Sequence, residues 1–118
     1  MILSLSMPSM GQQMTSGTVT SLGIAAGDPL KVGSKLLDVR VDLSTAAPQD
    51  CPPIFYFRMV AREKGWVRKV AVSVGEEKSV GDVLALISTE PDEPLDGPVV
   101  RPLRVASAAI VPEFEWLG

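Results

Sequence analysis

Histidine is absent from this chain of 118 residues, and the chain has a single cysteine, Cys51. Without histidine there is no imidazole for a Ser-His-Asp or Cys-His catalytic arrangement, for a His-based metal site or for general-base catalysis. A single cysteine forms no internal disulfide. The sequence therefore excludes most hydrolase mechanisms, and we expect no enzymatic activity and no metal site.

Long apolar runs and basic runs are also missing. No stretch approaches about 18 uninterrupted apolar residues, so no transmembrane helix is expected, and the opening residues, MILSLSMP, lack the charged region of a signal peptide. Eleven basic residues against fourteen acidic ones give a net charge of −3, and six residues are aromatic. This composition lacks the basic footprint of a nucleic-acid binder. We expect a cytoplasmic protein whose partners are proteins rather than nucleic acid or a membrane.

The chain does contain a series of short segments typical of β-strands. They are rich in Val, Ile and Leu, they partly alternate apolar with polar residues, and Gly-containing turns separate them. No helical period persists over about 11 residues or more. With 46% hydrophobic residues and the length of one domain, the sequence predicts a single all-β core. The predicted strands are residues 2–7, 17–24, 35–42, 54–61, 66–74 and 83–88.

Two segments of 23 residues resemble each other without a gap. Residues 17–39, GTVTSLGIAAGDPLKVGSKLLDV, align with residues 65–87, GWVRKVAVSVGEEKSVGDVLALI. Neither segment can bury its apolar face alone, so we expect two halves, related by an approximate twofold axis, in one flattened barrel or sandwich. The alternative is a chance similarity between two Val/Gly-rich segments. Six positions are identical: Gly17/Gly65, Val19/Val67, Gly27/Gly75, Val32/Val80, Gly33/Gly81 and Leu36/Leu84.

Residues 7–19, MPSMGQQMTSGTV, match the pattern Met-Pro-x-Leu-Gly-x-x-x-x-Glu-Gly-x-Val, with Met10 for Leu and Ser16 for Glu. Residues 27–39 match Gly-Asp-x-Val-x-x-Gly-x-x-Leu-x-x-Ile, with Leu30 for Val and Val39 for Ile. Together with the repeat, these patterns resemble the biotinyl/lipoyl domain family, most closely the lipoyl domain of the dihydrolipoamide acyltransferases of 2-oxoacid dehydrogenase complexes. The resemblance implies a lipoyl-like barrel-sandwich, or hammerhead, fold for a domain over residues 1–89.

The attachment site of that family is altered in this chain. The resemblance implies an Asp-Lys dipeptide at a hairpin tip, with lipoate on the lysine. Here Asp42 matches the aspartate, but Leu43 occupies the lysine position. Gly65 follows Leu43 by 22 residues, about twice the spacing in the family, which predicts an enlarged loop at about 43–56. Because a modifying ligase requires a lysine held in a defined position, we expect neither lipoate nor biotin here.

Two other residues are candidates for attachment of an acyl group or cofactor. Cys51 is expected in an exposed loop, where a thiol can be acylated or oxidised, although Asp50 beside it disfavours the thiolate. Lys64 is expected at a turn at the opposite end of the domain. Either residue would make the chain a carrier that is modified at an unconventional position. The other interpretation is an unreactive cysteine and a solvated lysine.

Surplus apolar residues indicate surfaces for protein contacts. The segment with Ile54, Phe55 and Phe57 is expected to be a strand, but it is more apolar than one face of a small sheet requires. Residues 90–103 are rich in Pro, Asp and Glu, as linkers are. Residues 104–118 form an apolar tail, including Phe114 and Trp116, that packs back on the domain or pairs with another chain, including a second copy. The sequence thus predicts a cofactor-free interaction or structural module, and the resemblance implies a place beside a 2-oxoacid dehydrogenase-type complex.

Overall fold

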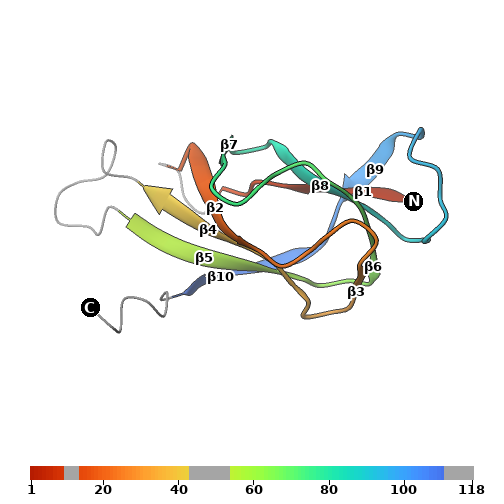
Figure 1. Cartoon of the computed structure of the whole chain (residues 1–118), viewed down its shortest axis with the longest axis horizontal. Coiled ribbons are helices and arrows are strands. Elements are labelled where there is room, and N and C mark those ends of the chain that lie inside the picture. The colour runs from red at the N-terminus through yellow and green to blue at the C-terminus, as the bar shows by residue number, and fades with distance from the viewer. Residues whose placement is uncertain (10–13, 43–53, 111–118) are drawn as a thin grey trace.

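The structure is a computed structural model that describes residues 1–9, 14–42 and 54–110. This part of the chain contains strands and no helix, so the prediction of an all-β protein is confirmed (Figure 1). Each of the six predicted stretches coincides with one strand to within a few residues. The strands are β1 (Ile2–Ser6), β2 (Ser16–Leu22), β3 (Pro29–Leu30), β4 (Lys35–Asp42), β5 (Ile54–Ala61), β6 (Gly65–Val70), β7 (Glu77–Ser79), β8 (Val83–Ser88), β9 (Val99–Pro102) and β10 (Val105–Ile110).

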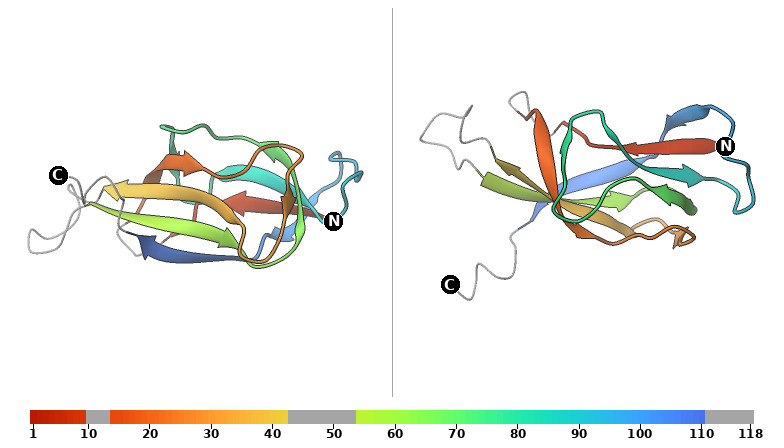
Figure 2. Two further views of the ribbon diagram at one scale, coloured as in Figure 1. Left: turned by 60° about the horizontal axis from the view of Figure 1, so that its bottom comes forward. Right: turned by 45° about the horizontal axis from the view of Figure 1, so that its top comes forward.

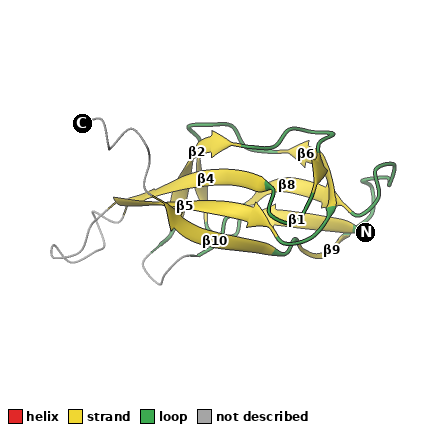
Figure 3. Cartoon of the chain, turned by 90° about the horizontal axis from the view of Figure 1, so that it is seen from below, coloured by secondary structure: helices red, strands yellow, loops and turns green. Residues whose placement is uncertain are grey.

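The strands form two five-stranded sheets, in the orders β3-β6-β8-β1-β9 and β10-β5-β4-β2-β7. Neighbouring strands are antiparallel except for β1 and β9, which are parallel. The sheets face each other across one hydrophobic core (Figures 2 and 3). Side chains alternate between the two faces of each strand. In β4, for example, Leu37, Val39 and Val41 lie in the core, and Leu36 lies there too, where the register with β5 shifts.

In the described part of the chain, no helix is long and apolar enough to cross a membrane.

The two sequence repeats make the same backbone contacts at positions 48 residues apart. The Gly27 amide donates to the Val67 carbonyl at 2.6 Å, and the Gly75 amide donates to the Val19 carbonyl at 2.7 Å. The register of the β2–β4 pair shifts after Val19, and the register of the β6–β8 pair shifts after Val67. The sequence similarity therefore corresponds to a repeated pattern of hydrogen bonds.

Each repeat also supplies a short strand to the sheet of the other. β3, from the first repeat, pairs with β6 of the second, and β7, from the second repeat, pairs with β2 of the first. In each repeat the short strand is flanked by two turns, and each turn contains a glycine. These glycines have positive φ values, which a Cβ atom makes unfavourable. Among the described residues only these four have positive φ: Gly27 (96°), Gly33 (94°), Gly75 (91°) and Gly81 (94°).

Residues 99–110 cross from the edge of one sheet to the edge of the other (Figure 1). β9 pairs in parallel with β1, the buried Leu103 follows, and β10 pairs with β5. The structure thus places a strand inside the stretch 90–103 that we expected to be a linker. The β-branched pair Val99 and Val100 suits pairing with β1, whose second edge is otherwise open. We call residues 99–110 the crossing segment.

Candidate functional site

The β4–β5 hairpin leads to the position where the lipoyl-like pattern is altered. Its last described pair is Asp42 opposite Ile54. Leu43 and Cys51 lie outside the described residues, as does most of the predicted loop at 43–56. Asp42 is exposed, and its Oδ2 atom is 3.7 Å from Nη2 of Arg40. The two strands therefore end in a charged pair beside an apolar residue.

The three apolar residues that we expected in a contact patch have different environments. Ile54 is 40% exposed, whereas Phe57 is fully buried in the core. Phe55 is half-buried and packs against the core, with its ring centroid 6.4 Å from that of Phe57. Because side chains alternate along β5, Phe57 points inward. Phe57 is therefore part of the core rather than of a contact surface, and Ile54 is the only one of the three that is exposed. Phe114 and Trp116 lie outside the described residues.

The outer face of the hairpin carries a mixed set of side chains close to Ile54. Tyr56 lies opposite Arg40 in the β4–β5 register, and both are half-buried. We call Arg40, Asp42, Ile54 and Tyr56 the hairpin face. Aromatic residues and arginine are enriched in protein–protein interfaces, so the composition of this face suits a protein partner.

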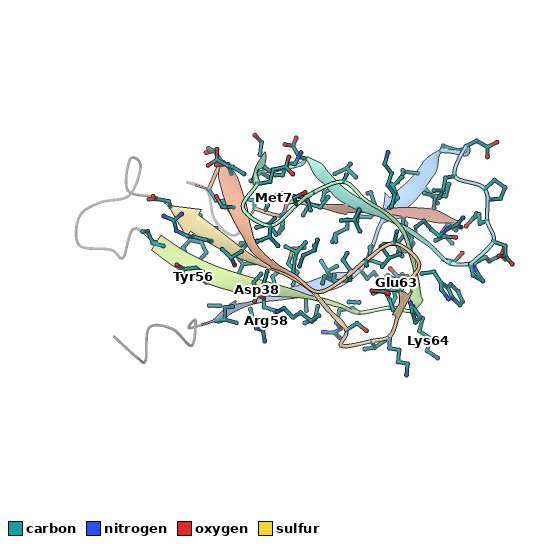
Figure 4. All side chains as sticks on the ribbon, in the orientation of Figure 1. Met7, Asp38, Tyr56, Arg58, Glu63 and Lys64 are labelled. Atoms are coloured by element: carbon teal, nitrogen blue, oxygen red, sulfur yellow. The ribbon has the colours of Figure 1, made fainter. Side chains whose placement is uncertain are left out.

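A buried carboxylate lies further along the same outer face and was missed by the sequence analysis. Asp38 is 7% exposed, and Arg58 donates to its two oxygens at 2.8 and 3.2 Å (Figure 4). Lys35 Nζ is 3.3 Å from Asp38 Oδ2 and donates to Ser21 Oγ at 3.0 Å. The alternation of charged and apolar residues in β4 and β5 was a signal that these charges share one face. Only the β4–β5 register shows that Asp38 and Arg58 lie opposite each other.

The Asp38 network holds the carboxylate in its ionised form. Burial alone would raise the pKa of Asp38, but the hydrogen bonds and charges of Arg58 and Lys35 outweigh it and lower that pKa from its usual 3.8. A carboxylate closed off by two cations is poorly suited to accept a proton from a substrate. This network therefore supports the sheet rather than forming a reactive centre.

Lys64 lies at the opposite end of the molecule from Tyr56 and the hairpin face (Figure 4). Its side chain is exposed and borders a shallow hollow of about 490 Å³. The lining is mostly apolar and comes from the β3 segment and the start of β6. It consists of Pro29, Leu30, Lys31, Val32, Lys64, Gly65 and Trp66.

Within residues 1–9, 14–42 and 54–110, no three His, Cys, Asp or Glu side chains form a group that could hold a metal ion. Comparisons with protein-family models, with curated proteins and with solved structures found no match for this chain.

Proposed function

We propose that this chain is a lipoyl-like β-sandwich module that carries no cofactor and acts through contacts with another protein. The observation that carries the proposal is the end of the β4–β5 hairpin. β4 ends at Asp42, which matches the aspartate of the lipoyl pattern, and the next residue is Leu43, whose side chain has no amine. Ile54, which lies opposite Asp42, presents an apolar side chain that is 40% exposed.

The repeated architecture supports the lipoyl-like part of the proposal. The two halves share turns, register shifts and hydrogen bonds, and each gives a short strand to the other. Two such halves around one core are what the flattened barrel of the biotinyl/lipoyl family implies. The proposed setting, beside a 2-oxoacid dehydrogenase-type complex, follows from the same resemblance.

The first test is the intact mass of the protein purified from its own host. We expect the mass of the unmodified chain. An increment for a lipoyl, biotinyl or acyl group would overturn the proposal and support a carrier. Peptide mapping would then locate the group at Cys51, at Lys64 or elsewhere, and Cys51→Ala or Lys64→Ala would remove it.

The second test asks whether the hairpin face binds a protein. Ile54→Asp adds a charge to this face, and Val32→Asp adds the same charge at an exposed valine, 62% accessible, near Lys64. In a pull-down from host lysate, we expect Ile54→Asp to lose the partner that the wild type and Val32→Asp retain. Equal recovery by all three proteins would show that the hairpin face is not the contact surface.

A further inference from the structure

Four strands lie at the edges of the two sheets in the described part of the chain: β3, β9, β7 and β10. Exposed edges can pair with other strands, and proteins usually block them with proline, charge, bulges or short length. β3 has two residues and begins with Pro29. β7 has three residues, including Glu77 and Lys78, and β9 contains Arg101 and Pro102. Three of the four edges are therefore protected.

β10 has none of these protective features. Its six residues, VASAAI, include no charge, no proline and no glycine. It pairs with β5 at six consecutive positions without a register shift, unlike the neighbouring β4–β5 and β2–β4 pairs. Its other edge pairs with no described residue. A regular, uncharged edge with small side chains is well suited to accept another strand.

We propose that β10 is the docking edge for a second copy of this chain. The two β10 strands pair antiparallel across a twofold axis that is perpendicular to the sheet, and two five-stranded sheets become one continuous sheet. Residues opposite each other in an antiparallel pair point to the same face. The axis therefore passes between two copies of the same residue. The longest pairing within Val105–Ile110 results when that residue is Ser107 or Ala108.

The sequence of β10 is compatible with itself in either arrangement. An axis at Ser107 places Val105 opposite Ala109 and Ala106 opposite Ala108. An axis at Ala108 places Ala106 opposite Ile110 and Ser107 opposite Ala109. No two charges meet across the axis, and like charges opposite each other are the usual obstacle to such pairing.

The strand behind β10 also permits the approach of a second copy. Arg58 of β5 lies opposite Ala108 of β10, so dimerisation brings the Arg58 side chains of the two copies closer together on the same face of the sheet. Each of them is ion-paired with Asp38 at 2.8 Å, which offsets their mutual repulsion. The inference rests on the β10 edge alone and does not depend on the proposed function.

The experiment measures the mass of the full chain in solution, by light scattering and sedimentation from micromolar to millimolar concentration. We expect a monomer–dimer equilibrium. Ala108→Glu places two like charges near the axis, so dimerisation weakens by roughly tenfold. The control, Val100→Glu, adds the same charge to the β9 edge, where Val100 is 61% exposed, and leaves the dimer intact.

A monomeric wild type at all concentrations would overturn the proposal, as would equal effects of Ala108→Glu and Val100→Glu. If Ala108→Glu does not fold, hydrogen exchange of the wild type decides. The amides of residues 105–110 then become more protected as the concentration of the chain rises, whereas protection that does not depend on concentration contradicts the dimer.

Discussion

At the residue scale, Gly17 and Gly65 determine how closely the first strand of each repeat approaches its neighbour. A Cβ at Gly17 would lie 2.5 Å from Val39 Cγ1, and a Cβ at Gly65 would lie 2.9 Å from Ile87 Cγ2. Val39 and Ile87 are themselves equivalent positions of the repeat. The shared glycine is therefore explained by the same packing contact in both halves.

We expect Gly17→Ala and Gly65→Ala each to lower the free energy of unfolding by about 1–3 kcal/mol, because the added methyl group overpacks the core. Gly97→Ala is the control, since its Cβ would have its nearest neighbour at 3.9 Å and Gly97 has no positive φ. Chemical denaturation of the three variants measures the difference. A control as destabilised as the other two would show that the contacts with Val39 and Ile87 are not the cause.

At the element scale, one carboxylate adds to the strand pairing that attaches the crossing segment to the two sheets. Glu63, in the turn between β5 and β6, accepts two hydrogen bonds from the Arg101 guanidinium, each 2.8 Å long. It also accepts the backbone amide of Arg104 at 2.7 Å. The Arg101 hydrogen bonds, with smaller contributions from Arg104, lower the pKa of Glu63 from 4.5 to about 2. The Glu63 carboxylate thus connects the β5–β6 turn to the part of the crossing segment that passes from one sheet to the other.

We expect Glu63→Gln to destabilise the protein by about 1 kcal/mol at pH 7, since a neutral amide replaces the charged acceptor. Because the folded state lowers the pKa of Glu63, its stabilisation is complete above pH 4.5 and is lost as the pH falls toward about 2. The difference in melting temperature between wild type and variant therefore shrinks over this interval. Glu77→Gln, on the short β7 edge, is the control, and a pH-independent difference for Glu63→Gln would contradict the role of the carboxylate.

The sequence was sufficient to predict the longer strands but not the elements that depend on distant pairing. β3 and β7 are too short to show a period, and each is stabilised by the other repeat. β9 lies in a stretch whose prolines and acids are typical of linkers. In the candidate site, the alternation that buries Phe57 was visible, but the Asp38–Arg58 contact depends on the register of β4 and β5, which the intervening residues do not specify.

At the scale of the whole molecule, the exchange of β3 and β7 makes the two halves depend on each other. Cutting between Asp42 and Ile54 would leave β3 and β1 without their partners β6 and β8, and β2 without β7. One core contains side chains from both fragments, so neither fragment retains a closed hydrophobic interior.

We expect residues 1–50 and 51–118, produced separately, to be unfolded, and an equimolar mixture of the two to recover the β-sheet signal in circular dichroism. Dispersed amide resonances in the mixture provide a second measurement. A fragment that folds by itself would show that its half is an independent unit, contrary to the exchange of strands.

The pairing of β1 with β8 has a consequence for synthesis of the chain on the ribosome. Ile2 lies opposite Ser88, and Leu3 lies opposite Ile87, so the ribosome makes β1 more than 80 residues before it makes the strand with which β1 pairs. At common elongation rates this interval is roughly 4–16 s. During that time the apolar side chains of β1 lack their β8 partner, so fast synthesis of the chain up to β8 shortens the period in which β1 is open to misfolding.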